Sequence, residues 1–165
     1  MSSPVTEPTP RRLPLPEGTL PVGLGVVVSG ITSYAFFKVG QVALGKEAFK
    51  PVMTLWFVAY TLVPGFFIPV EQELGRALAD RRARGSGGLP VIRRVSALTL
   101  ALLSFIVVAV VAASGWMTEH MFEGNVVVAV ALVGAVASYA LAHVAKGISS
   151  GSGRFPSYGI ILGGD

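Results

Sequence analysis

One charged residue lies inside an otherwise uncharged apolar segment. Lys38 is embedded in the first long hydrophobic stretch of the chain. A charge within a membrane span is costly and marks a candidate functional position. Tyr34 and Gln41 lie one helical turn on either side and would share its face. An ammonium is suited to a phosphate group, so we predict a candidate cavity of these three residues. Alternatively, the Lys38 stem reaches the membrane interface and binds nothing.

Patterns typical of enzymes are missing from the sequence. The chain has no cysteine, which excludes disulfides, thiolate metal sites and thiol nucleophiles. It contains neither a nucleotide-binding Gly-x-x-x-x-Gly-Lys-Ser/Thr loop nor a His-Glu-x-x-His zinc motif. His120 falls in a predicted outer loop, and we expect His143 to be an interfacial residue at an inner helix end. No carboxylate is expected within a span, which argues against proton or sodium coupling. The sequence predicts no catalytic residue, cofactor or metal site.

Four long apolar stretches dominate the 165 residues, of which 52% are hydrophobic and 13% charged. A helix needs roughly 20 apolar residues to cross a bilayer, and the backbone of such a run must satisfy its own hydrogen bonds. The sequence therefore predicts an all-α, polytopic integral membrane protein. Its four transmembrane helices are expected near residues 20–45, 50–80, 93–116 and 124–148.

The remaining segments are short. Residues 1–19 are rich in proline and predict a disordered cytoplasmic tail. Residues 20–149 form the predicted four-helix transmembrane region, and residues 150–165 a cytoplasmic turn leading into a truncated fifth helix. Small residues recur at helix-packing distance at Gly25, Ser29 and Ser33, and again at Gly134, Ser138 and Ala142. The segment 147–151 has the same spacing, but we expect a turn there.

Basic residues are distributed unevenly between the two sides of the predicted bundle. Ten of the 13 fall on one side if the helices alternate, whereas only Lys46 and Lys50 fall on the other. The second loop on that other side is acidic, with Glu119 and Glu123. Because cytoplasmic loops carry the excess of lysine and arginine, we predict a plasma (inner) membrane protein with both termini cytoplasmic.

An arginine cluster connects the second and third predicted helices. Its members are Arg76, Arg81, Arg82, Arg84, Arg93 and Arg94. Each such charge near a membrane surface contributes about 1 kcal/mol of attraction to anionic lipids. The cluster lies where the orientation rule requires it, so we interpret it as a topogenic signal that contacts membrane lipids. The alternative is a substrate-binding role. This placement argues against nucleic acid as a partner.

The chain resembles the N-terminal part of the polysaccharide-biosynthesis flippases, in the multidrug/oligosaccharidyl-lipid/polysaccharide exporter superfamily. The resemblance covers nearly the whole chain after the tail. Its motifs lie at residues 42–49, 54–60, 69–76 and 146–159, the last being similar to an Arg-Gly-x-x-x-Gly-x-Gly-Arg-Phe-x-x-Tyr turn. Lys146 stands where that pattern often has arginine. The order and spacing of the motifs carry the resemblance.

The resemblance implies a segment of one lobe of a larger transporter. Family members have about 12 to 14 helices in two lobes that enclose a polar cavity, so the sequence looks like a fragment whose remaining helices are its partners. The implied function is translocation of lipid-linked saccharides for cell-envelope polysaccharide synthesis, without covalent chemistry. Two alternatives stay open. One is a complete small four-helix scaffold or accessory protein of an envelope-synthesis complex, and the other is a multidrug-type exporter fragment.

Overall fold

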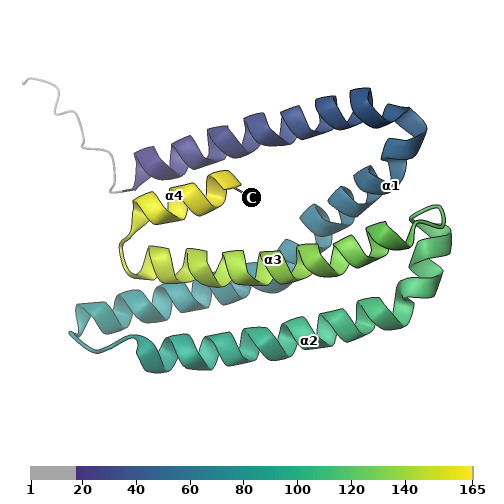
Figure 1. Ribbon diagram of the computed structural model, residues 1–165. Coiled ribbons are helices and arrows are strands. Elements are labelled where there is room, and N and C mark those ends of the chain that lie inside the picture. The colour runs from purple at the N-terminus through teal and green to yellow at the C-terminus, as the bar shows by residue number, and fades with distance from the viewer. Residues whose placement is uncertain (1–17, 165) are drawn as a thin grey trace, which may run out of the picture.

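The computed structural model describes residues 18–164, which form helices joined by short turns (Figure 1). No strand occurs within this range. The helices are α1 (Thr19–Ala83), α2 (Leu89–His120), α3 (Val126–Gly151) and α4 (Phe155–Gly164). The predicted all-α fold is therefore confirmed. Most of the predicted tail lies outside the described residues.

Helix α1 is divided into two arms by Gly45. A straight helix of its 65 residues would be about 98 Å long, three times the thickness of a bilayer core. Gly45 adopts φ 77° and ψ 165°, a non-helical conformation that glycine accommodates without steric cost. The chain turns back there, so residues 19–44 (the first arm) and residues 46–83 (the second arm) run in opposite directions (Figure 1).

Helices α1, α2 and α3 are each long and apolar enough to cross a membrane. The two arms of α1 contain the segments predicted at 20–45 and 50–80, and α2 and α3 contain those predicted at 93–116 and near 124–148. Helix α4 then lies beside the first arm (Figure 1).

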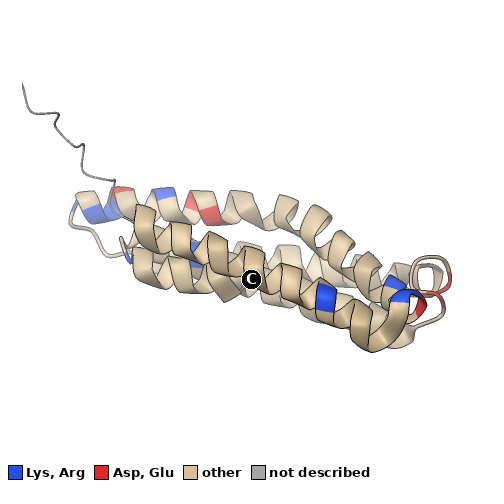
Figure 2. Ribbon diagram, turned by 90° about the horizontal axis from the view of Figure 1, so that it is seen from above, with Lys and Arg blue, Asp and Glu red and all other residues tan. Residues whose placement is uncertain are grey.

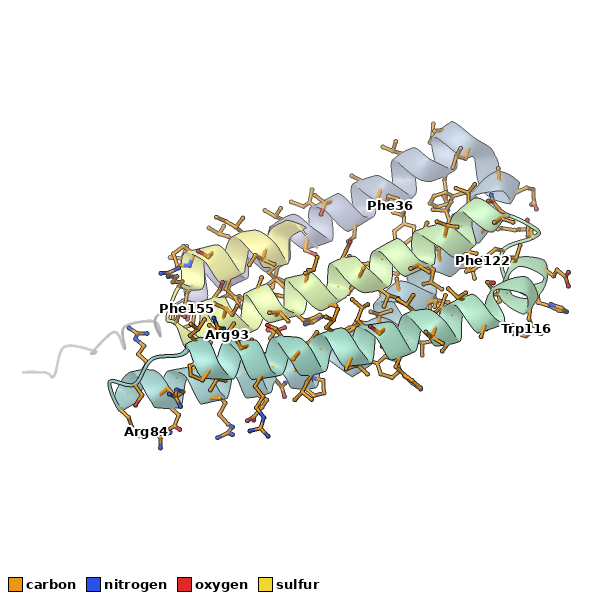
Figure 3. The ribbon with its side chains drawn as sticks, turned by 60° about the horizontal axis from the view of Figure 1, so that its bottom comes forward. Phe36, Arg84, Arg93, Trp116, Phe122 and Phe155 are labelled. Atoms are coloured by element: carbon orange, nitrogen blue, oxygen red, sulfur yellow. The ribbon has the colours of Figure 1, made fainter. Side chains whose placement is uncertain are left out.

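Charged residues gather toward the two ends of the elongated bundle, and the middle is almost free of them (Figure 2). Arg84, Arg93 and Phe155 lie at one end, and Trp116 and Phe122 at the other (Figure 3). The arginine cluster and the acidic second loop thus occupy opposite ends of the molecule, which is the separation that the orientation argument requires.

The core lies between the second arm, α2 and α3. Phe67, Phe122, Leu132 and Val136 are at most 2% exposed there. The first arm, in contrast, presents most of its side chains outward, including Leu24, which is 58% exposed. In a membrane such a surface would face lipid or further helices.

Close helix packing depends on glycines near the end of α3. A Cβ added at Gly151 would lie 2.7 Å from the carbonyl oxygen of Gly75, and one at Gly147 would lie 2.9 Å from that of Glu71. The turn expected at residues 147–151 is therefore wrong, because α3 continues through Gly151 and packs directly on the second arm. Gly134, in contrast, has no atom within 4 Å of an added Cβ.

The different surroundings of Gly151 and Gly134 predict different effects of a leucine substitution at the two positions. Gly151→Leu forces the α3 and α1 backbones apart and is expected to cost about 1–3 kcal/mol of unfolding free energy, as overpacking does. Gly134→Leu is the matched control, which we expect to be neutral or slightly stabilising because leucine favours the helix. Denaturation in detergent, followed by circular dichroism, measures both. Equal stability of the two variants would contradict this packing.

Candidate functional site

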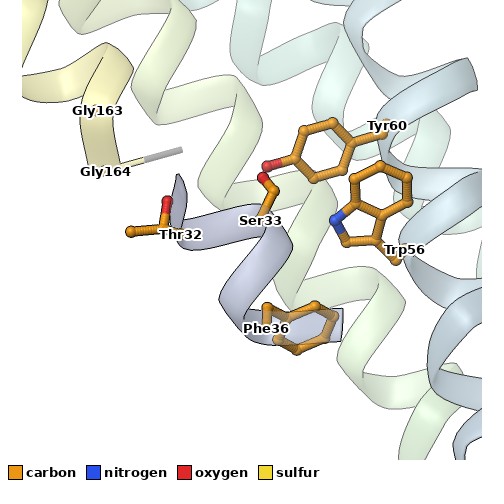
Figure 4. Close-up of a pocket in the computed structure, with 7 residues that line it drawn as sticks. All are labelled: Thr32, Ser33, Phe36, Trp56, Tyr60, Gly163 and Gly164. Atoms are coloured by element: carbon orange, nitrogen blue, oxygen red, sulfur yellow. The ribbon is translucent and has the colours of Figure 1, made fainter. Parts of the chain in front are cut away.

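A pocket of about 310 Å³ lies between the two arms of α1 and the end of α4. Its lining residues are Thr32, Ser33, Phe36, Trp56, Tyr60, Gly163 and Gly164 (Figure 4). The side chains of Ser33, Trp56 and Tyr60 are turned toward the same space. The pocket thus combines aromatic faces with hydroxyl groups.

The aromatic wall of this pocket is held in place by ring contacts. Trp56 stacks on Tyr60 with ring centroids 4.3 Å apart, and Phe37 meets Trp56 edge-on at 4.7 Å. Tyr60 in turn contacts Tyr139 of α3 at 5.8 Å. Since such pairs stabilise one ring arrangement, the wall is preorganised for a ligand with apolar faces.

The predicted cavity residues lie elsewhere on the first arm. Tyr34, Lys38 and Gln41 are all exposed, and Tyr34 is 72% exposed. None of the three lines the pocket, which takes its first-arm residues from the adjacent positions Ser33 and Phe36. The three share an exposed surface, and their role as ligand contacts stays a prediction.

A polar cluster connects α1, α3 and α4. The Nδ1 atom of His143 in α3 lies 2.6 Å from a carboxylate oxygen of Glu71 in the second arm. The hydroxyl of Tyr158 in α4 donates a hydrogen bond of 2.9 Å to the other oxygen of Glu71. Both carboxylate oxygens therefore have partners from helices that are distant in the sequence.

This cluster, which we call the Glu71 cluster, is shielded by protein. The side chain of Glu71 is 15% exposed and that of His143 is 5% exposed. The His143 ring stacks between Phe67 and Tyr139, at centroid distances of 6.4 and 5.9 Å. Lys146, one turn further along α3, is also only 5% exposed. The polar and ionisable groups at this place are thus largely enclosed by the helices.

The second ring nitrogen of His143 is buried and has no hydrogen-bond partner among the described residues. A buried polar atom without a partner is unusual in native structures. The interfacial position expected for His143 is wrong, because α3 continues for eight residues beyond it and α1 covers it. The expected lack of a carboxylate inside the bundle is also wrong, because α3 and α4 enclose Glu71.

The Glu71 cluster brings a carboxylate, an imidazole and a phenol from three helices into direct contact. Within residues 18–164 no three histidine or acidic side chains lie close enough to hold a metal ion.

The arginines of the predicted cluster lie at one end of the bundle with different partners. Arg76 makes hydrogen bonds of 3.0 and 2.8 Å to Glu73, and Arg84 pairs with Asp80. Arg81 donates to the carbonyl oxygen of Gly87 at 2.7 Å. Arg82, Arg93 and Arg94 are exposed. These positions are compatible with contact to anionic lipid headgroups.

Comparison of the chain with protein-family models, curated proteins and solved structures finds no match. The site is therefore interpreted from its own geometry. Sequence reasoning missed the Glu71 cluster, although the segments 69–76 and 146–159, which contain Glu71 and Tyr158, were both singled out in the sequence. His143 lies in an apolar run and gives no sequence signal of its own.

Proposed function

We propose that these helices belong to a membrane transporter, of the class that translocates lipid-linked saccharides for cell-envelope polysaccharide synthesis. The observation that carries the proposal is the Glu71 cluster. Ionisable groups inside a membrane bundle are costly and are typical of transport pathways. In a passive four-helix scaffold, the same side chains would serve only to hold the helices together.

Two of the stretches that resemble the flippase family, 69–76 and 146–159, lie in contact, which supports the proposed class. Glu71 belongs to the stretch 69–76, and Lys146 and Tyr158 belong to the stretch 146–159. The hydrogen bond between Tyr158 and Glu71 and the close contact of Gly147 with the second arm bring these stretches together. Spatial contact explains why both stretches would be needed in the same protein.

The pocket between the arms supports a saccharide as the transported group. Sugar rings present C–H faces that pack on aromatic rings and hydroxyls that need hydrogen bonds, and Trp56, Tyr60 and Ser33 offer both. A flat lipophilic drug would use the aromatic wall alone. A multidrug-type exporter is therefore the second candidate, and an envelope-complex scaffold is the third.

A translocation assay tests the proposal. The full-length transporter that contains these helices is reconstituted in liposomes with a fluorescent polyprenyl-diphosphate-linked saccharide, and a membrane-impermeant reagent quenches the outer leaflet. We expect protein-dependent movement of the saccharide between leaflets. Transport of lipophilic cations instead would favour the multidrug exporter, and transport of neither would favour the scaffold.

The same assay tests the predicted role of Lys38. If its ammonium contacts a diphosphate, Lys38→Gln lowers transport about tenfold at unchanged abundance, and Lys38→Arg preserves part of it. Lys46→Gln, beside the bend at Gly45, is the control and should transport normally. Wild-type rates for Lys38→Gln would show that this side chain only extends to the interface.

A further inference from the structure

A second polar cavity lies at the arginine-rich end of the bundle. Its volume is about 360 Å³, and it is formed where the end of α1 meets the turn between α3 and α4. Arg82 at the end of α1 and Ser86 just after it line this cavity. Ser152 and Arg154, in the turn between α3 and α4, line it as well. No carboxylate lines it among the described residues.

Two arginines in this cavity differ from their neighbours. Arg76 and Arg84 are ion-paired, and Arg81 donates to a backbone carbonyl. The guanidinium groups of Arg82 and Arg154 make no hydrogen bond or ion pair within residues 18–164. Their donors are therefore available to a ligand.

The turn is shaped to admit the Arg82 side chain. Gly153 has φ +70°, and a Cβ at this position would overlap the Arg82 guanidinium. Helices α1 and α3 end here while α2 and α4 begin, so the helix dipoles largely cancel. The two guanidinium groups set the positive charge of the cavity.

We propose that Arg82 and Arg154 together bind a phosphate group, with the hydroxyls of Ser86 and Ser152 as further donors. Arginine presents a planar fork of N–H donors that matches phosphate oxygens in pairs. The inference singles out one arginine of the cluster and adds Arg154 from a distant segment. It goes beyond the proposed transport function and does not depend on it.

The phosphate could come from a lipid headgroup or from solution, and the two sources are distinguished by the probe. Purified protein in detergent is titrated with inorganic phosphate by calorimetry, and with phosphatidic acid by native mass spectrometry. Phosphatidylcholine, whose headgroup is zwitterionic, gives the background. Binding of both probes assigns the cavity to phosphate in general, and binding of phosphatidic acid alone assigns it to a lipid headgroup.

Variants test the residues. Arg82→Gln and Arg154→Gln are each expected to weaken binding at least about tenfold, for whichever of the two probes wild type binds. This is the effect of losing charge-assisted hydrogen bonds. Arg84→Gln is the matched control, since it removes the same charge nearby but does not line the cavity. Arg82→Lys, which keeps the charge without the fork, should bind more weakly than wild type.

The melting temperature of each variant checks that the fold is retained. The proposal is overturned if wild type binds neither probe above background. It is equally overturned if Arg84→Gln weakens binding as much as Arg82→Gln, since the arginines would then act only as a diffuse charge.

Discussion

Glu71→Gln is expected to destabilise the protein by about 1–3 kcal/mol, the typical cost of leaving a buried hydrogen-bonding group without its partner. The carboxylate accepts hydrogen bonds from His143 and Tyr158. A glutamine amide has only one oxygen, and its NH2 group cannot accept a hydrogen bond, so one of the two donors loses its partner. Denaturation in detergent, followed by circular dichroism, measures the loss.

Glu73→Gln provides the control from the same helix. Glu73 pairs with Arg76 on the surface, and the two side chains are 56% and 70% exposed. Exposed pairs contribute little to stability, so this variant should be nearly as stable as wild type. Equal losses for Glu71→Gln and Glu73→Gln would contradict the burial of the Glu71 cluster.

Single cysteines introduced at the two ends of the bundle should each be labelled from one side of the membrane only. The chain contains no cysteine, so Ser86→Cys and Glu119→Cys each introduce the sole reactive thiol. Both positions are exposed and lie at opposite ends of the bundle. The excess of basic residues at the Ser86 end predicts that this end is cytoplasmic.

An impermeant maleimide applied to intact cells should then label Glu119→Cys and leave Ser86→Cys unlabelled. Inverted membrane vesicles should give the reverse result. Labelling of both thiols in intact cells would show that the bundle does not span the membrane as proposed. Labelling of Ser86→Cys alone would reverse its orientation.

The helices could be predicted because long apolar runs carry strong local information. Predicted spans at 93–116 and 124–148 correspond to α2 at 89–120 and α3 at 126–151. The division of α1 was also foreseeable, because a continuous helix through both apolar runs would be far too long for one crossing. The pattern did not show that the break between the two arms is confined to one residue, Gly45, with helix directly before and after it.

The Glu71 cluster could not be predicted, because it depends on how the helices rotate and cross. Glu71 directly follows an apolar run and is succeeded by Glu73 and Arg76, so it reads as part of an exposed amphipathic segment. Its burial comes from His143, 72 residues further on, and from Tyr158, 87 residues further on. Lys38, in contrast, was conspicuous in the sequence, yet it lies on an exposed face.

The glycines illustrate the same limit. Gly134 and Gly151 have similar sequence surroundings, each with a small residue four positions away. Of these two glycines, Gly151 lies where α3 crosses the second arm, and there the missing side chain permits close approach, whereas Gly134 has open space. Spacing identifies the candidates for close packing, and the crossing point selects among them.

The most direct test of the central claim, that the Glu71 cluster serves transport, is the translocation rate of His143→Asn. The side-chain NH2 of asparagine lies nearly where Nδ1 of histidine lies, so it can still donate the hydrogen bond to Glu71. Asparagine has no atom that corresponds to the buried Nε2. The two ring nitrogens have distinct roles, so this variant separates structure from function. At equal stability and membrane abundance, we predict that transport of the lipid-linked saccharide falls at least about tenfold. Wild-type transport by His143→Asn would show that the cluster only holds the helices together and would contradict the account.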